Sequence, residues 1–286
     1  MTFTTRFAPS PTGPLHLGHA FSAMTAHDMA RAAGGRFLIR IEDIDQSRSR
    51  PEWEALILQD MQWLGLRPDG PVRRQSDHFD DYRDAIKSLS EQGLAYPCSC
   101  SRRDIEAAAS APQEGVPAFG PDGRIYPGTC RGRSMDSRRP GDAIRLDLGK
   151  ALPFDLPGFA ETGPLQEGWH PVSRDGLMAQ VGDPVLARPN MAASYHLSVV
   201  IDDAAQHVTD VVRGADLFEA TFLHVALQAL LGLPVPRYHH HRLIRDADGK
   251  RLAKRDDARA ISLYRAEGSS PDEIRQMVGL PIPSAP

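Results

Sequence analysis

Cysteine and excess positive charge are scarce in this chain of 286 residues, and it has no long apolar run. Its three cysteines, Cys98, Cys100 and Cys130, cannot form a closed set of disulfides, so we expect reduced thiols and a cytoplasmic location. The net charge of −4 gives no general attraction for nucleic acid, and any RNA contact must use local basic surfaces. The longest apolar stretch, residues 222–233, is too short to span a bilayer, and no signal peptide is recognisable.

Apolar residues make up 41% of the sequence, enough for a sizeable core, and their spacing predicts an α/β fold. Strand-like and helix-like segments alternate, which predicts a doubly wound, Rossmann-like parallel sheet. The expected strands are 4–8, 36–42 and the apolar run 197–201, and the expected helices are 17 onward, 51–64, 79–92 and 216–231. Asp216 is expected to cap the last of these helices, and Gly232 to end it.

We expect three blocks along the chain. Residues 1–92 form the first half of the catalytic sheet, residues 93–189 an inserted α+β subdomain, and residues 190–286 the second half. The middle block is rich in glycine and proline, holds all three cysteines and has a short strand-like run at 143–148. The pattern of the first block resumes after it, which is why we interpret it as an insertion.

The most informative segment is Arg6-Phe-Ala-Pro-Ser-Pro-Thr-Gly-Pro-Leu-His-Leu-Gly-His19. It predicts a strand, an irregular loop constrained by proline and glycine, and then a helix. Free N–H groups and a partial positive charge at the helix N-terminus favour an anion in the loop. His16 and His19 lie on one face of the first helical turn, so the segment suits a polyphosphate.

This segment resembles the HIGH signature of class I aminoacyl-tRNA synthetases, in the form carried by their glutamyl and glutaminyl branch. A second segment, Arg251-Leu-Ala-Lys-Arg255, resembles the KMSKS loop of the same class, with Lys254 at its second lysine and Arg251 in place of its first. A lysine there neutralises the charge that develops on the pyrophosphate leaving group. The resemblance implies an ATP site, used with Mg²⁺, that is formed by His16, Gly18, His19, Arg251 and Lys254. It implies a catalytic role for His16, His19 and Lys254.

The residues around these motifs favour an acidic amino acid as the substrate. Arg6 and Arg213 are two permanently charged groups that can hold a side-chain carboxylate by forked hydrogen bonds. Glu42 is a suitable anion for the ligand ammonium at a strand's C-terminal end, and Asp43 and Asp45 are its rivals. The resemblance implies a glutamate pocket formed by Arg6, Phe7, Ala8, Pro9, Ser10, Glu42, Tyr195 and Arg213.

The cysteines suggest a small structural zinc site. Thiolates at Cys98, Cys100 and Cys130 supply three ligands, whereas structural zinc takes four. The residue types in this region leave four candidates for the fourth ligand, which are Tyr126, Asp122, Glu114 and water. The pattern Cys-x-Cys followed by Tyr-x-x-x-Cys resembles the zinc site of the glutamyl-queuosine tRNA(Asp) synthetase branch, which implies Tyr126. The alternative is three reduced cysteines with a structural role only.

Two further clusters have ordinary alternatives. The run His239-His240-His241 is expected to be a strand segment beside the nucleotide loop, because consecutive strand residues point to opposite faces and cannot converge on one metal ion. A basic run in the middle block either contacts RNA phosphates or is a solvated loop. That run consists of Arg131, Arg133, Arg138 and Arg139.

Only 31 residues follow Arg255, which leaves no room for the anticodon-binding domain that continues a glutamyl-tRNA synthetase. The chain therefore resembles the glutamyl-queuosine branch. That resemblance implies tRNA-independent activation of L-glutamate with ATP, followed by transfer to the queuosine base in the anticodon loop of tRNA(Asp). It also implies one zinc ion per chain, and we expect a monomer. One alternative is a minimal glutamyl-tRNA synthetase that acts on the tRNA 3′ end, and another is a non-catalytic RNA-binding paralogue.

Overall fold

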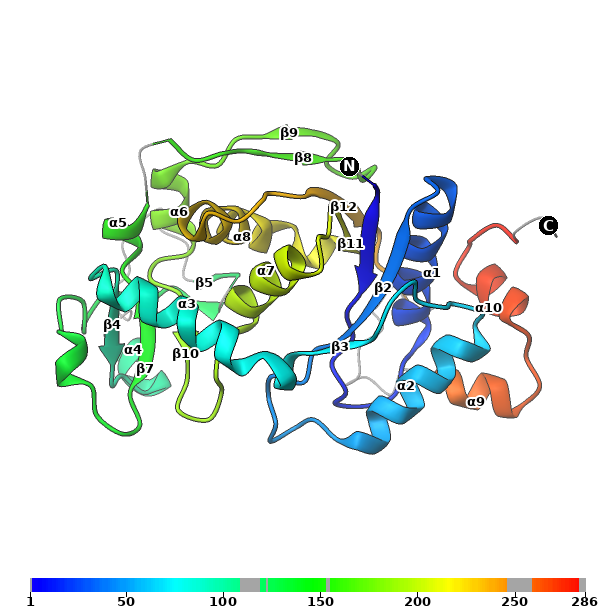
Figure 1. The fold of residues 1–286 in the computed structure, drawn as a ribbon, viewed down its shortest axis with the longest axis horizontal. Coiled ribbons are helices and arrows are strands. Elements are labelled where there is room, and N and C mark those ends of the chain that lie inside the picture. The colour runs from blue at the N-terminus through cyan, green and yellow to red at the C-terminus, as the bar shows by residue number, and fades with distance from the viewer. Residues whose placement is uncertain (1, 109–118, 122, 153–154, 246–258, 283–286) are drawn as a thin grey trace.

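A computed structural model describes residues 2–108, 119–121, 123–152, 155–245 and 259–282 (Figure 1). Its centre is a largely parallel sheet built from both ends of the chain and from residues 159–170 of its middle. One part has the order β1-β2-β3 and the other β11-β12-β8-β9, in which only β9 runs antiparallel to its neighbour. The strands are β1 (Thr4–Phe7), β2 (Arg36–Ile41), β3 (Arg73–Arg74), β8 (Phe159–Glu161), β9 (Gly168–His170), β11 (Asp210–Gly214) and β12 (Arg237–His241).

The two parts of this sheet meet at β1 and β11. The Thr209 N–H donates to the Thr4 carbonyl oxygen at 2.9 Å, and the Thr4 N–H donates to Thr209 Oγ1 at 2.8 Å. Strands that are some 200 residues apart in sequence therefore become neighbours. This confirms the predicted α/β fold with a parallel sheet.

Helices cover this sheet, and the three predicted with both ends, at 51–64, 79–92 and 216–231, lie within two residues of the observed bounds. They are α1 (Leu17–Ala32), α2 (Pro51–Trp63), α3 (Phe79–Glu91), α7 (Tyr195–Ala205), α8 (Phe218–Leu231), α9 (Ile261–Ala266) and α10 (Pro271–Met277). Pro51 begins α2, where its missing N–H costs no hydrogen bond. Gly232 ends α8 in the left-handed conformation, as expected, and Ser270 with Glu273 forms a capping box at the start of α10.

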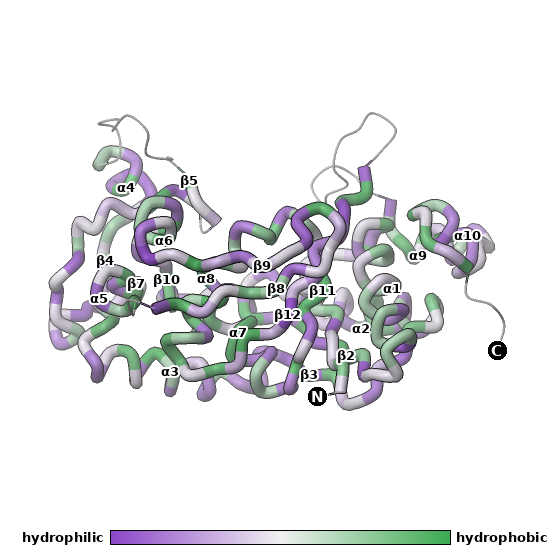
Figure 2. Tube along the Cα trace, turned by 90° about the horizontal axis from the view of Figure 1, so that it is seen from above, coloured by the Kyte–Doolittle hydropathy of each residue, from purple (hydrophilic) through white to green (hydrophobic). Residues whose placement is uncertain are grey.

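The middle of the chain adds a second, antiparallel sheet of order β10-β7-β4. Seen from above, the molecule is elongated, with α4 and α5 at one end and α9 and α10 at the other (Figure 2). The elements of this block are β4 (Ala95–Cys98), α4 (Arg102–Ala108), β5 (Phe119–Gly120), β6 (Gly123–Arg124), β7 (Ala143–Leu146), α5 (Leu148–Ala151), α6 (Arg174–Gln180) and β10 (Val185–Ala187).

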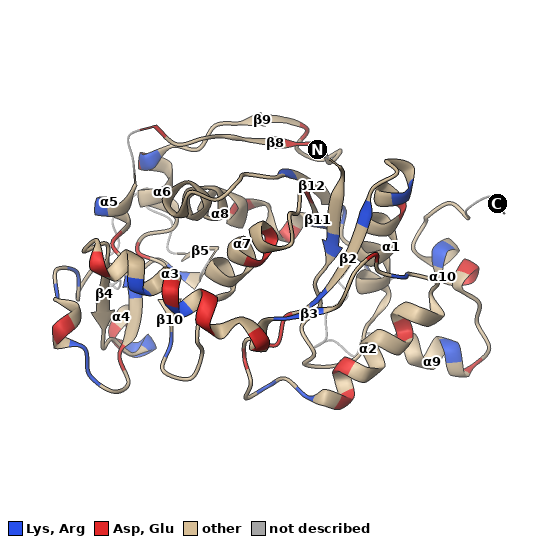
Figure 3. Cartoon of the chain, viewed as in Figure 1, with Lys and Arg blue, Asp and Glu red and all other residues tan. Residues whose placement is uncertain are grey.

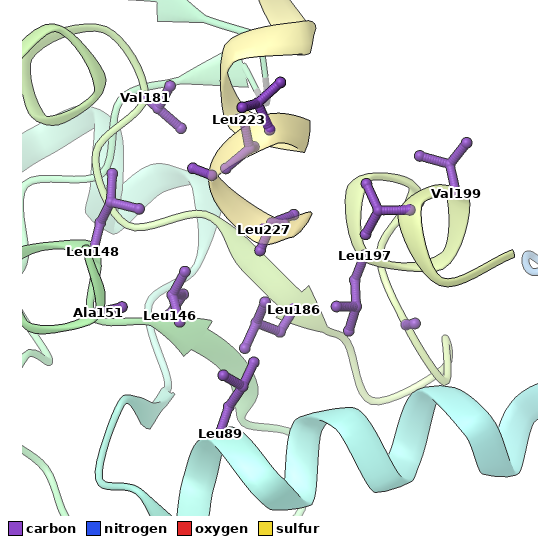
Figure 4. Close-up of a cluster of buried hydrophobic side chains, with 14 of the residues drawn as sticks. Leu89, Leu146, Leu148, Ala151, Val181, Leu186, Leu197, Val199, Leu223 and Leu227 are labelled. Atoms are coloured by element: carbon purple, nitrogen blue, oxygen red, sulfur yellow. The ribbon is translucent and has the colours of Figure 1, made fainter. Parts of the chain in front are cut away.

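One apolar cluster joins this block to the rest of the molecule. Leu146 of β7 and Leu186 of β10 pack with Leu89 of α3, Leu197 of α7 and Leu223 of α8 (Figure 4). The middle block thus shares its core with helices on both sides of it in sequence. Its boundaries at residues 93 and 189 stay a prediction.

The prediction of a strand at 197–201 is wrong, because these residues lie inside α7. Ser194 caps that helix by accepting a hydrogen bond from the Leu197 N–H at 3.4 Å. The helix is enclosed by the core on most sides. A continuous apolar run is typical of both a buried helix and a buried strand, so the sequence pattern does not distinguish the two. Asp216 also does not cap α8, since it lies in a 3₁₀ turn at 215–217 and α8 begins at Phe218.

Asp60 of α2 should make stability depend on pH. It is fully buried, Arg265 Nη1 lies 3.1 Å from Oδ1, and neither carboxylate oxygen has a hydrogen bond within the described residues. Burial outweighs the Arg265 charge and raises the pKa of Asp60 to about 6. Because the folded pKa lies above the unfolded value of about 4, ionisation favours the unfolded chain, and stability falls as the pH rises from about 4 through 6.

Asp60→Asn is therefore expected to raise the free energy of unfolding by about 2 kcal/mol at pH 7.5 and to change it little near pH 4. Urea denaturation at the two pH values measures this difference. An equal effect at both values would show that ionisation of Asp60 is not the cause.

Candidate functional site

A cavity of about 370 Å³ opens where β1, β2 and β11 end. Ligands of open α/β sheets bind at these carboxyl ends of the strands. All eight residues predicted for the amino-acid pocket line it: Arg6, Phe7, Ala8, Pro9, Ser10, Glu42, Tyr195 and Arg213. The predicted site did not include five further lining residues, which are Thr12, Ser22, Val212, Gly214 and Leu217.

The alternatives to Glu42 point elsewhere. Asp43 Oδ1 accepts a hydrogen bond from the Ser76 N–H at 2.9 Å, and Asp45 Oδ1 accepts one from Ser47 Oγ at 2.6 Å. Neither aspartate lines the cavity. Glu42 is thus the acidic residue that the structure brings to this cavity.

Arg6 lies in a buried ion-pair network beneath the cavity. Its Nε and Nη2 donate to the two carboxylate oxygens of Asp203 at 2.8 and 3.2 Å, and Arg40 Nη1 donates to Asp203 Oδ1 at 2.8 Å. Figure 3 shows the acidic segments of α7 next to basic segments of β1 and β2. Burial raises the pKa of Asp203, but the charges of Arg6 and Arg40 outweigh it and lower the pKa to about 2. The charge of Arg6 is therefore compensated within the protein.

Glu42 has a weaker partner. Arg40 Nη2 lies 3.4 Å from Glu42 Oε1, and the Glu42 side chain is 9% exposed. Burial raises the pKa of Glu42 above its ordinary value despite the nearby charges of Arg40 and Arg6. A ligand ammonium in the cavity would stabilise the ionised form.

Arg213 has a different environment from Arg6. Its guanidinium donates to His240 Nε2 and to His224 Nδ1, both at 3.1 Å, and to Thr221 Oγ1 at 2.8 Å. Arg213 and His240 are paired residues of the neighbouring strands β11 and β12, which is why their side chains meet. The histidine run is therefore a strand segment, as predicted, but its middle residue contacts a residue of the cavity.

His16 and His19 form the N-terminus of α1. His16 Nδ1 accepts a hydrogen bond from the Gly18 N–H at 3.1 Å, and His19 Nδ1 accepts one from the His16 N–H at 3.2 Å. The two rings are 3.8 Å apart between centroids. A Cβ at Gly18 would lie 3.0 Å from the His16 ring, which explains the glycine. His19 also lines the cavity, so the residue that accepts the His16 N–H at the helix start faces the same space as the pocket residues.

The second predicted motif, with Arg251 and Lys254, lies outside the described residues. The chain after it returns to the first motif, where the Ile261 N–H donates to the Leu15 carbonyl oxygen at 2.8 Å and Ala260 forms a β-bridge with His16. Residues 260 and 261 thus lie beside the first motif.

The three cysteines lie together in a small cluster at the end of β4. Their sulfur atoms are within 4.8 Å of one another, and the Tyr126 hydroxyl is 3.4 Å from the sulfurs of both Cys98 and Cys100. The Cys130 N–H donates to this hydroxyl at 2.8 Å. Three thiols and one phenol oxygen in this arrangement fit a tetrahedral zinc ion. Asp122 and Glu114, the other predicted ligands, lie outside the described residues.

The thiols of this cluster differ in acidity. Burial raises the pKa of Cys130, but hydrogen bonds from Tyr126 and from the Ser99 backbone outweigh it and lower the pKa to about 6. Burial raises the pKa of Cys100 to about 11, and burial and the thiol contacts also raise the pKa of Tyr126. The lowered pKa of Cys130 favours its thiolate, which is the form that binds a metal ion.

The basic run of the middle block is partly engaged in ion pairs. Arg131 Nε lies 2.8 Å from Asp183 Oδ2, and Arg133 Nη2 lies 2.9 Å from Asp142 Oδ2. These two arginines help to fold the block, whereas Arg138 lines a separate cavity of about 620 Å³ together with Arg83 and other residues.

Sequence reasoning missed the residues behind the cavity walls. Asp203 contacts Arg6 and is shared with Arg40, whereas Thr221, His224 and His240 contact Arg213. None of these five residues lines the cavity. One usable signal was the pair Asp202-Asp203 inside an apolar run, because buried acids need partners. No helix in the described part of the chain combines the length and apolar character needed to cross a membrane.

A sequence model of the family "tRNA synthetases class I (E and Q), catalytic domain" matches residues 2–118 and 173–281. The chain therefore belongs to this family of class I tRNA synthetases. Within curated proteins it is similar to a glutamyl-Q tRNA(Asp) synthetase of Rhodobacter capsulatus, with 64% identity over 96% of this chain and 99% of the relative. A glutamyl-Q tRNA(Asp) synthetase of Symbiobacterium thermophilum is 41% identical over 94% of this chain and 83% of the relative.

Solved structures show the same fold. A glutamate tRNA ligase from Elizabethkingia meningosepticum, in complex with its amino acid, superposes with a TM-score of 0.75 at 28% identity and covers 97% of this chain. This chain spans only 60% of that ligase. A methionyl-tRNA synthetase from Mycobacterium tuberculosis shares the fold with a TM-score of 0.56 at 13% identity.

Proposed function

We propose that this chain activates L-glutamate with ATP, without needing tRNA for this step, and transfers the glutamate to the queuosine base in the anticodon loop of tRNA(Asp). One observation supports this most: the cavity combines a buried arginine, Arg213, held by neutral groups, with a buried carboxylate, Glu42. That pair suits an amino acid with an acidic side chain. The similarity to glutamyl-Q tRNA(Asp) synthetases over 99% and 83% of their length supports the second substrate.

In the proposed first step, a carboxylate oxygen of glutamate attacks the α-phosphorus of ATP, and the bond to the β-phosphate oxygen breaks. Glutamyl-adenylate and pyrophosphate result. Gly18, His16 and His19 at the start of α1 orient the phosphates, and Arg251 and Lys254 neutralise the leaving pyrophosphate. Mg²⁺ bound with ATP would supply further positive charge to the phosphates.

In the proposed second step, a hydroxyl oxygen of the modified base attacks the activated carbonyl carbon. AMP leaves, and the hydroxyl proton passes to a phosphate oxygen or to solvent. The middle block would present the RNA surface, and the cluster of Cys98, Cys100, Tyr126 and Cys130 would hold one zinc ion that fixes this block. The free thiols suit a reducing compartment, so we propose a cytoplasmic location.

One assay tests both steps. Purified protein is incubated with ATP and labelled glutamate, and with tRNA(Asp) that either contains queuosine or carries guanine at that position. We expect adenylate to form without tRNA and label to transfer only to the queuosine-containing tRNA. Equal transfer to both tRNAs would instead indicate a glutamyl-tRNA synthetase that acts on the 3′ end. The absence of adenylate with any amino acid would indicate a non-catalytic RNA-binding protein.

A further inference from the structure

The hydrogen-bond partners of Arg213 are all uncharged groups. The guanidinium donates to two imidazole nitrogens, His240 Nε2 and His224 Nδ1, to the hydroxyl of Thr221, and to the carbonyl oxygen of Leu217 at 3.2 Å. Within the described residues no carboxylate forms an ion pair with Arg213, which is 6% exposed. Arg6, by contrast, is paired with a carboxylate. The two arginines of the cavity therefore differ in how much of their charge is left for a ligand.

The arginine also fixes the protonation of both histidines. Because a guanidinium is only a donor, His240 Nε2 and His224 Nδ1 must both accept, and a protonated imidazole cannot do so. The remaining nitrogens then carry the hydrogens: His240 Nδ1 donates to Glu161 Oε2 at 2.5 Å, and His224 Nε2 donates to His196 Nδ1 at 2.9 Å. Burial lowers the pKa of His224 and His240, in line with neutral rings.

The orientation of Glu161 is fixed so that its Oε2 accepts the hydrogen bond from His240 Nδ1. Its Oε1 accepts the N–H groups of His240 and Gly163 at 2.8 and 2.6 Å, which leaves Oε2 for the imidazole. A Cβ at Gly163 would lie 2.4 Å from the His240 carbonyl oxygen and 2.6 Å from Oε1, so this close approach requires glycine. The tautomer of His240 is thus set by a rigid turn after β8.

We propose that Thr221, His224 and His240 are positioning residues that select a carboxylate over an amide in the ligand. They hold Arg213 through neutral acceptors only, so its buried charge is compensated by the side chain of the bound amino acid. A ligand carboxylate regains this Coulomb energy, whereas the amide of glutamine does not. The inference rests on the proposed activation of glutamate, and none of the three residues lines the cavity.

The matched pair Thr221→Asp and Thr221→Asn tests the proposal. Asp, Asn and Thr are close in size, and both replacements keep an acceptor beside Arg213 Nη2. Only Asp adds a negative charge that competes with the ligand. Pyrophosphate exchange is measured with glutamate and with glutamine.

For Thr221→Asp, relative to Thr221→Asn, we expect KM for glutamate to rise at least about tenfold, because a buried partner for a charge is worth at least 1.4 kcal/mol. The preference for glutamate over glutamine should fall by the same factor, with kcat changed less than about threefold. Equal KM values and equal preferences in the two variants would overturn the proposal. If wild type fails to exchange pyrophosphate with glutamate, the proposed function fails and the inference with it. If wild type is active and the variants are alike, only the inference fails.

A second variant keeps the proposal falsifiable if Thr221→Asp does not fold. In Glu161→Gln the amide oxygen must stay on the two backbone N–H groups, which places the NH₂ group against His240 Nδ1. His240 then carries its hydrogen on Nε2, opposite the Arg213 Nε–H. The Arg213 guanidinium is then displaced by the facing hydrogen, which weakens glutamate binding without changing the reacting atoms. We therefore expect KM for glutamate to rise at least about tenfold at unchanged kcat. An unchanged KM in this variant would contradict the proposal.

Discussion

Arg213→Gln is expected to lower kcat/KM for glutamate activation by about 10³-fold, because truncating one partner of a buried charge pair costs roughly 2–5 kcal/mol. The side chain is buried at the cavity wall, and within the described residues its hydrogen-bond acceptors carry no formal charge. A bound carboxylate would therefore lose its main counter-charge. Pyrophosphate exchange with varied glutamate and fixed ATP measures the effect, and KM for ATP should stay unchanged.

Arg213→Lys is the control that keeps the positive charge but removes the planar guanidinium. Lysine keeps the positive charge but cannot reach His224, His240 and Thr221 from one planar group. We expect an intermediate loss, with glutamate still preferred over glutamine. Near wild-type kcat/KM in Arg213→Gln would show that Arg6, despite its pairing with Asp203, holds the ligand carboxylate alone.

Cys130→Ser is expected to remove bound zinc from the purified protein. Structural zinc sites in small folds bind with about 10–16 kcal/mol, and the loss of a thiolate ligand removes a large part of this. Metal content by mass spectrometry should fall from about one zinc per chain to near zero. The melting temperature should fall as well, because Cys98 lies on β4 and connects the cluster to the antiparallel sheet.

Two variants serve as comparisons. Ser99→Ala removes a hydroxyl that lies 4.0 Å from Cys130 Sγ without removing a ligand, so zinc content should stay at the wild-type level. Tyr126→Phe should weaken zinc binding about 10–100-fold if the phenol oxygen completes the tetrahedron, as for the loss of a supporting partner at other metal sites. Full zinc occupancy in Cys130→Ser would contradict the assignment, and unchanged affinity in Tyr126→Phe would leave water as the fourth ligand.

The local elements were predictable where short-range signals decide them. Pro51 at the start of α2, Gly232 after α8 and the capping box of Ser270 each act within a few residues of chain, and Gly232 ends α8 as expected. The strand prediction for residues 197–201 was wrong because Leu197 and its apolar neighbours are enclosed by the core that the middle block shares with α7 and α8. Only that packing distinguishes a buried helix from a buried strand.

The residues of the candidate site could be predicted from the sequence, but which of their charges are paired within the protein could not. By itself the sequence determined the strand–loop–helix that contains His16 and His19, the reduced cysteines, and the two arginines near the predicted pocket, because these depend on residue types at short spacing. Only the tertiary structure decided that Arg6 is neutralised by Asp203 and that Arg213 is not neutralised within the described residues. The reason is physical: Asp203 of α7 and His240 of β12 contact the two cavity arginines from distant parts of the chain. No local pattern encodes which distant side chain will be nearest to a buried charge.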